Sequence, residues 1–261
     1  MHNSSQKIKK AGRHLYTERD LEGLRKVGRA VTHALMEMVN HIRPGINVLR
    51  LDEIAGGVLS SFGARSAPKL LEGFPGNTCI SLNEVIAHGV PHNRILRCGD
   101  FINIDVSAEL GGYFGDVGYS LVMGEFNDHL ANLCACAKQA TMLAIRESIA
   151  GNSLKTIARH IEDEARKNGY TVLRNLCSHG VGKSLHAYPQ SIKNYYDPDE
   201  EDLYLEAGMV IAWEPYISTG ACRAIESDDG WSLTTHDQSR VAQFEHTVLV
   251  TSGRPEIITA L

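Results

Sequence analysis

The chain has 261 residues, enough for one large domain or two small ones, and its 43% hydrophobic and 22% charged residues are ordinary values for a globular protein. A formal net charge of −5 gives no reason to expect nucleic acid as the main partner. No apolar stretch approaches the roughly 20 residues that a membrane-spanning helix needs, so we expect no membrane partner either.

The first elements in chain order are a tail and two helices. Residues 1–16 are polar and basic without an apolar segment, which predicts a flexible tail and not a secretory signal. Thr17 begins a helix with a capping motif, and apolar residues recur at helical spacing as far as Ile42. A second helix is expected over residues 49–62.

The later elements alternate between strands and helices. Beyond residue 62 the sequence predicts, in chain order, strands over 78–87, 100–107 and 112–123, a helix capped by Asn127 or Asp128 and continuing to Ile149, a helix from Ser153 to Gly169, and mainly strands over 170–261. Helix pairs followed by strands predict an α+β protein.

A faint internal repeat divides the chain into two halves. His88 and His179 each precede Gly-Val, and Asp105 and Glu214 each stand six residues after a glycine. Two matches in the same order indicate a duplicated α+β unit, with pseudo-repeats over about 17–124 and 125–261 inside one domain, 17–261. A site between such halves would draw acidic residues from both.

The cysteine pattern bears on the cellular compartment. None of the six has the paired spacing of a short secreted protein, so a reduced, cytoplasmic setting fits best. Cys134 and Cys136 fall within a helical pattern, where core packing is the more common role.

Two aspartates flank a Gly-Gly turn and form the most informative pair in the chain. A hairpin about Leu110-Gly111 would place Asp105 and Asp116 directly opposite each other, with Cβ atoms roughly 5 Å apart. Two carboxylates that close cannot both ionise cheaply, so one pKa must rise or a cation must lie between them.

Further acids occupy similar surroundings. Glu214 and Glu245 lie in apolar strand segments, where acids are rarely buried unless paired or bound to metal. Any one of them would more often face solvent or pair with an arginine, but the four together indicate a site. His179 adds an imidazole, although a lone histidine is more often structural. Such a hard donor set suits Mn, Fe(II), Co or Zn, and four carboxylates could neutralise two divalent ions. The reaction would then be hydrolysis of an amide or a phosphate ester.

Six segments carrying these residues resemble type I methionine aminopeptidases. They are NTCISLNEVIAHGVP (77–91), GDFINIDV (99–106), GYFGDVG (112–118), SHGVGKSLH (178–186), VIAWEP (210–215) and AQFEHT (242–247). The resemblance extends over about residues 15–255. It implies the pita-bread fold, in which two related α+β halves with a central antiparallel sheet enclose a dinuclear metal site.

The resemblance also implies a role for each site residue. The metal ligands would be Asp105, Asp116, His179, Glu214 and Glu245, with Asp116 and Glu245 bridging. Glu214 would in addition shuttle a proton. His88 and His186 would contact the scissile amide. The substrates would be the N-termini of nascent polypeptides, met at the ribosome, and the enzyme would act as a monomer.

The resemblance is weakest in the pocket for the methionine side chain. Cys79 and Trp231 match the family pattern, whereas Leu185, Leu71 and Phe74 stand where Phe, Tyr and Tyr are usual. Leucine remains apolar, so a thioether side chain should still be accepted.

Two alternatives share this fold. One is an enzyme that cleaves beside proline, such as aminopeptidase P or prolidase, which normally carries a large N-terminal domain. The other is a metal-free binding protein, in which loss of metal ligands would be expected, whereas this chain keeps all five.

Overall fold

The computed structural model describes residues 16–124 and 127–260. The helices are α1 (Glu18–His41), α2 (Val48–Ser61), α3 (Ala67–Glu72), α4 (Asp128–Arg146) and α5 (Leu154–Lys167). The strands are β1 (Arg65–Ser66), β2 (Cys79–Leu82), β3 (Phe101–Leu110), β4 (Tyr113–Val122), β5 (Thr171–Val172), β6 (Ser178–Gly180), β7 (Ala187–Ile192), β8 (Val210–Trp213), β9 (Tyr216–Ser218), β10 (Ile225–Glu226), β11 (Leu233–Thr234), β12 (Val241–Gln243), β13 (Glu245–Leu249) and β14 (Glu256–Ile257).

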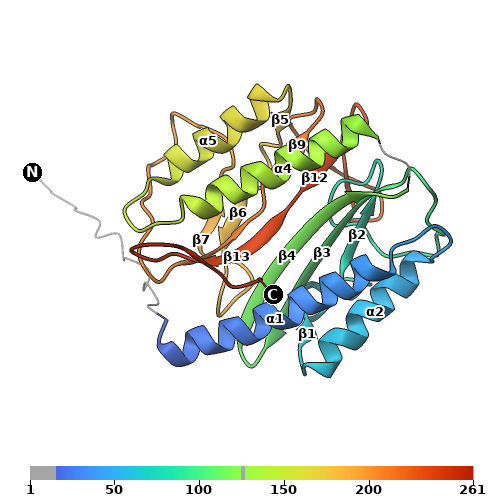
Figure 1. Ribbon diagram of the computed structural model, residues 1–261, viewed down its shortest axis with the longest axis horizontal. Coiled ribbons are helices and arrows are strands. Elements are labelled where there is room, and N and C mark those ends of the chain that lie inside the picture. Colours follow the sequence, from blue (N-terminus) through green and yellow to red (C-terminus); the bar gives the residue numbers. More distant parts are fainter. Residues whose placement is uncertain (1–15, 125–126, 261) are drawn as a thin grey trace, which may run out of the picture.

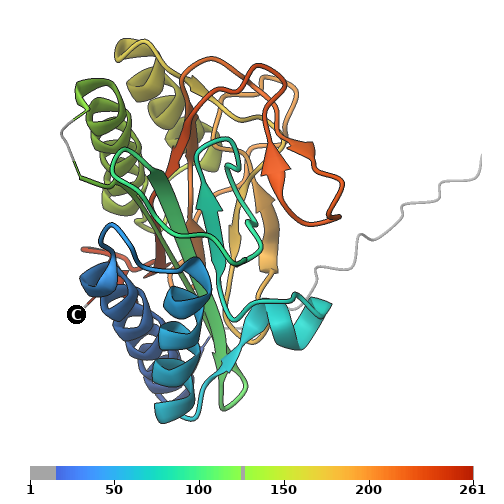
Figure 2. The same ribbon diagram turned by 90° about the vertical axis from the view of Figure 1, so that its right-hand side faces the viewer.

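One antiparallel sheet organises the described part of the chain. Its main path runs β1-β3-β4-β13-β8-β6-β7, while β2 pairs with β3 and β14 with β13. Helices α1 and α2 cover one half of the sheet and α4 and α5 the other half, as Figure 1 shows. In Figure 2 both helix pairs lie on the same side of the sheet, which leaves the other face to strands and loops. The fold is therefore α+β, as the sequence predicts.

Local sequence signals place the helices as expected. Thr17 and Asp20 form a capping box at the start of α1, and Asn127 and Ser153 cap α4 and α5 through their side chains. The short helix α3 was not expected; it begins after Ser66, whose side chain accepts a hydrogen bond at its N-terminus. None of the helices in the described ranges has the length and apolarity to cross a bilayer.

Other expected boundaries were too long. Of the strand expected over 78–87, only Cys79–Leu82 forms a strand (β2), although Ala87 makes an isolated bridge to Leu233. The helix expected to reach residue 149 ends at Arg146. The predicted tail, residues 1–16, lies outside the described residues except for Tyr16.

The β3–β4 hairpin corrects the expected register. Gly111 and Gly112 have φ of 62° and 88°, and they form a two-residue turn that pairs Leu110 with Tyr113. Asp105 therefore lies opposite Gly118, and Asp116 lies opposite Ser107, so the two aspartates are diagonal and not directly opposed. The error was a shift of two residues, which leaves both carboxylates on one face of the sheet.

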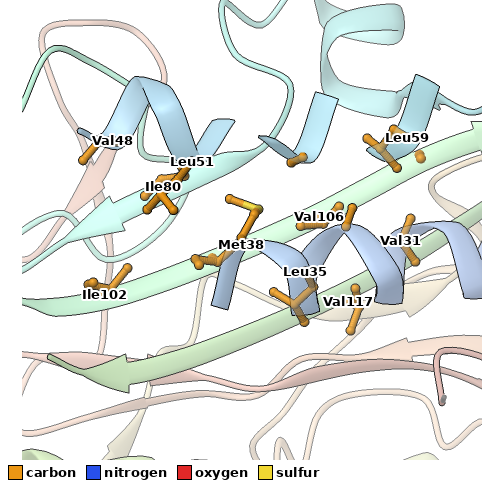
Figure 3. Packing of buried hydrophobic residues seen from close by; sticks show 14 of the residues in the cluster. Val31, Leu35, Met38, Val48, Leu51, Leu59, Ile80, Ile102, Val106 and Val117 are labelled. Carbon is orange, nitrogen blue, oxygen red and sulfur yellow. The ribbon is translucent and has the colours of Figure 1, made fainter. Parts of the chain in front are cut away.

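The face that each strand residue occupies follows from core packing. Ile102, Ile104 and Val106 are fully buried in a cluster with residues of α1 and α2, which Figure 3 shows from close by. Because side chains alternate along a strand, Asp105 projects from the opposite face. Val117 belongs to the same cluster, so Asp116 also projects away from the helices.

The second helix pair packs in the same way. Ile211, Trp213 and Val248 are fully buried in a cluster that includes residues of α4 and α5. Trp213 donates its indole N–H to Ser148 Oγ at 2.7 Å. The residues that alternate with this cluster on β8 and β13 face the same side of the sheet as the two aspartates.

A buried aspartate anchors the loop that leads into β2. Asp52 of α2 accepts hydrogen bonds from the backbone N–H groups of Asn77 and Thr78, at 2.8 and 2.9 Å, and from Thr78 Oγ1 at 3.0 Å. The donors come from a loop without regular structure, so this carboxylate replaces the missing partners.

Replacing Asp52 with alanine should destabilise the fold by about 2–3 kcal/mol, because buried N–H groups would lose a charged acceptor. Urea unfolding followed by tryptophan fluorescence measures the effect. Asp52→Asn keeps one acceptor oxygen and should lose less. Glu53→Ala is the control: it removes an exposed neighbour paired with Arg50 and should change stability by under about 0.5 kcal/mol. Equal losses of stability in Asp52→Ala and Glu53→Ala would contradict the role of Asp52 in holding the loop.

Candidate metal centre

Five neighbouring strands each bring one predicted ligand to the face opposite the helices. In sheet order the strands are β3, β4, β13, β8 and β6. Their residues are Asp105, Asp116, Glu245, Glu214 (directly after β8) and His179. The strands lie side by side in Figure 1, although their residues are spread over 141 positions of the chain, from 105 to 245.

The donor atoms of these residues converge. One ligand atom each from Asp116, His179 and Glu245 lies within 4.8 Å of the others. His179 Nε2 is 3.3 Å from Glu214 Oε1 and 4.0 Å from Asp116 Oδ2. Asp105 lies beside this group, because its charge, after burial, is the main cause that raises the pKa of Asp116. All five predicted ligands are thus in one cluster.

The imidazole of His179 is oriented for coordination through one nitrogen. Nδ1 lies 3.0 Å from the carbonyl oxygen of Gly180, which can only accept, so Nδ1 carries the proton. In the neutral ring the lone pair is then on Nε2, the atom that points at the carboxylates.

Burial and crowding raise the pKa of three carboxyls. Burial, followed by the charge of Glu214, raises the pKa of Asp105 to about 7. Burial and the neighbouring carboxylates raise the pKa of Asp116 and of Glu245 well above their usual range. Burial lowers the pKa of His179, but the contact with Glu214 and its charge, together with Gly180 and Asp105, outweigh burial and give a net rise. The cluster thus holds more negative charge than its surroundings stabilise without a cation.

A polar network fixes Glu245 and Asp116. The side chain of Gln243 donates to Glu245 Oε2 at 2.9 Å and accepts from Asn103 at 2.7 Å. Gly118 makes space for it, because a Cβ there would lie 2.2 Å from Gln243 Oε1. Thr247 exchanges two hydrogen bonds with the backbone of Asp116, at 3.0 and 2.9 Å.

A separate chain of hydrogen bonds fixes Glu214. Its backbone N–H donates to Ser178 Oγ at 3.0 Å, and Ser178 Oγ donates to Asn194 Oδ1 at 2.7 Å. Tyr216, two residues further on, is buried, and burial followed by the charge of the nearby Glu214 raises the pKa of its phenol well above the usual range. These contacts hold the carboxylate beyond the end of β8, next to His179.

The residues fit a metal because two of their oxygens lack other partners. Among the described residues, Asp116 Oδ1 and Glu245 Oε1 are buried without a hydrogen-bond partner. An unsatisfied carboxylate oxygen is costly in a protein interior unless a cation neutralises it. Four carboxylates and one imidazole nitrogen form a hard donor set, which suits divalent Mn, Fe, Co or Zn.

The predicted pocket residues lie around this cluster. Cys79 is buried directly across from Asp105. His186 packs its ring edge-on against that of His179, with centroids 4.4 Å apart. Burial and the charge of His179 lower the pKa of His186, and His88 is close enough to add to this effect. His88 has a positive φ of 51°.

The apolar residues predicted to line the methionine pocket are only partly brought together. Phe74 and Trp231 pack edge-to-face with centroids 5.3 Å apart, and Leu185 is buried. Leu71 is 52% exposed on α3, at the margin of any such pocket. Whether these four select the substrate side chain stays a prediction.

The supporting residues were missed by the sequence reasoning, although one signal was available. Gln243, Glu245 and Thr247 alternate along the chain, a polar spacing of two that is typical of one strand face, although Gln243 ends β12 and the other two residues belong to β13. Ser178 and Asn194 carry no such pattern, and only the tertiary structure connects them.

Comparison with known proteins agrees with this geometry. Residues 22–252 match the sequence family described as metallopeptidase family M24. Methionine aminopeptidase 2 of Bacillus subtilis is 46% identical over 94% of this chain and 98% of its own length. The crystal structure of methionine aminopeptidase from Rickettsia prowazekii superposes with a TM-score of 0.89 at 34% identity, covering 95% of this chain and 99% of that one. The Thermotoga maritima enzyme superposes with a TM-score of 0.91 at 32% identity, with the same coverage. The chain therefore belongs to metallopeptidase family M24, among the methionine aminopeptidases.

Proposed function

We propose that this protein removes the N-terminal methionine from peptides and nascent proteins whose second residue is small. The observation that carries the proposal is that five adjacent strands each bring a candidate ligand to one face of the sheet, three of them with ligand atoms within 4.8 Å of one another, and that two buried carboxylate oxygens lack partners. The relatives named methionine aminopeptidase, which match almost the whole chain, support the choice of substrate.

The metal ligands in this proposal are Asp105, Asp116, His179, Glu214 and Glu245. Four carboxylates can balance two divalent ions, so we propose two, drawn from Mn, Fe(II), Co and Zn. Bound there, such ions would supply Lewis-acid activation of the substrate carbonyl and of water. The fixed proton on His179 Nδ1 leaves Nε2 as its donor atom.

Glu214 is the proposed proton carrier. Ser178 anchors its backbone and His179 Nε2 lies 3.3 Å from its carboxylate, so the side chain is held at the edge of the cluster. The carboxylate would accept a proton from the attacking water and deliver it to the departing amine as the C–N bond breaks. The products are free methionine and a peptide shortened by one residue.

His88 and His186 are the proposed contacts to the scissile amide. A lowered pKa keeps His186 neutral at physiological pH, so its ring can donate a hydrogen bond to the amide oxygen. The positive φ of His88 is uncommon for a residue with a side chain and is typical of functional loops.

The methionine side chain is proposed to bind against Cys79, Phe74, Trp231, Leu185 and Leu71. Aromatic edges and an aliphatic wall suit a thioether, which packs well against rings. Nascent chains are cytoplasmic substrates, so we propose a cytoplasmic monomer that acts on N-termini as they leave the ribosome.

The metal-loaded protein should release methionine from Met-Ala-Ser but not from Met-Lys-Ser. The second residue would lie against the wall of the metal site, which would leave space for a small side chain such as that of alanine but not for that of lysine. Liquid chromatography of the products measures both reactions. Equal release from the two peptides would refute the selectivity, and faster cleavage of Ala-Pro-Ser than of Met-Ala-Ser would favour the alternative that cleaves beside proline.

Asp116→Asn should lower the number of metal ions bound per chain and reduce kcat by more than about 100-fold, because a ligand oxygen becomes an amide. Elemental analysis after dialysis and circular dichroism of the same samples separate metal loss from unfolding. Asp163→Asn is the matched control, since Asp163 pairs with Arg166 on the exposed face of α5. Normal activity of Asp116→Asn would refute the ligand assignment.

His186→Ala should lower kcat by about 100-fold with unchanged metal content, because it removes one donor to the amide oxygen. His41→Ala, at the end of α1 and outside the site, should have no effect. Loss of metal from His186→Ala would show that this histidine is a ligand.

A further inference from the structure

The loop between β6 and β7 is tied to the start of α1. Residues 181–186 carry Leu185 and His186, which the proposed function places against the substrate. Lys183, in the middle of the loop, reaches away from the site and lies 2.8 Å from Asp20 Oδ1. Asp20 belongs to the first turn of α1, more than 160 positions earlier in the chain.

Asp20 is a fixed acceptor and not a mobile surface acid. It is 8% exposed, and Tyr113 Oη donates to Oδ1 at 2.8 Å. Oδ2 accepts from the backbone N–H of Thr17 at 2.8 Å and from its hydroxyl at 2.6 Å. Helix capping requires only the Thr17 contacts. The additional donors, Tyr113 and Lys183, connect α1 to β4 and to the loop.

The backbone of the loop is held at the same place. The N–H of Phe114 donates to the carbonyl of Gly182 at 2.7 Å. The ring of Tyr16 packs against Gly182 so closely that an added Cβ would lie 1.7 Å from its hydroxyl oxygen. Tyr16 Oη also donates to the carbonyl of Val181 at 3.4 Å. Contacts from residue 16 and β4 thus converge on the two residues that precede Lys183, which itself pairs with α1.

We propose that the Lys183–Asp20 ion pair positions loop 181–186, so that Leu185 and His186 are set for the substrate; this rests on the proposed function. Lys183 is a positioning residue, since it touches Asp20 and not the ligand cluster. The Lys183 side chain is 49% exposed, and ion pairs of this kind contribute little to overall stability. Its effect should therefore be on the loop and on turnover more than on unfolding.

The first measurement does not depend on activity. Hydrogen exchange of the metal-free protein, followed by mass spectrometry, should show segment 181–187 exchanging roughly two- to fivefold faster in Lys183→Met than in wild type. The matched control is Lys26→Met, which removes the same charge from the exposed face of α1, where Lys26 pairs with Glu22 at 3.0 Å. This control should leave the exchange of segment 181–187 unchanged.

The second measurement uses the metal-loaded enzyme. Lys183→Met should lower kcat/KM for Met-Ala-Ser by about three- to tenfold with full metal content, because small displacements of groups around a substrate are costly. Discrimination between Met-Ala-Ser and Leu-Ala-Ser should fall as well, since Leu185 moves with the loop. Lys183→Arg keeps the positive charge, so it should restore most of kcat/KM and most of the discrimination between the two peptides.

The outcomes separate the two proposals. If the wild-type protein released no methionine, the proposed function would be refuted. The hydrogen-exchange result would still test whether the Lys183–Asp20 ion pair positions the loop. Unchanged exchange and unchanged kinetics in Lys183→Met would overturn the positioning role. Equal effects of Lys26→Met would assign the change to net charge and overturn it too.

Discussion

Repulsion among four clustered carboxylates, three of them buried and Asp105 half-buried, is the constraint around which this molecule is arranged. Asp105, Asp116, Glu214 and Glu245 lie on one face of the sheet, and burial with mutual charge raises the pKa of three of them. Protonation could relieve the repulsion, but it would leave the partnerless oxygens of Asp116 and Glu245 unsatisfied. Divalent cations relieve both problems together, which is why the site belongs to a metallopeptidase.

One face of the sheet forms the hydrophobic core, and the other face carries the candidate metal centre. Apolar residues on one face pack under the two helix pairs, while the residues that alternate with them form the carboxylate cluster. Around the ligands, Gln243, Thr247 and Ser178 use hydrogen bonds to fix the acids before any ion arrives. A site on regular strands with such support holds its geometry more firmly than one built on loops.

Sequence reasoning reached most of the site because the relevant signals are local. Helix caps at Thr17 and Ser153, and acids within apolar strands, depend on nearby residues. The register of the hairpin was wrong by two residues because it depends on the backbone of the Gly111-Gly112 turn. The Ser178–Asn194 contact and the Asp20–Lys183 pair join distant segments, and a single sequence carries no periodic signal for such pairs.

The place of β13 in the sheet has a consequence for how the protein matures. This strand lies between β4 and β8, yet it follows both of them in the chain. During synthesis from the N-terminus, the hairpin with Asp105 and Asp116 emerges some 130 residues before Glu245 does. The two halves cannot close around an ion until this late strand inserts between them. The complete set of five proposed ligands therefore exists only after this strand has been synthesised.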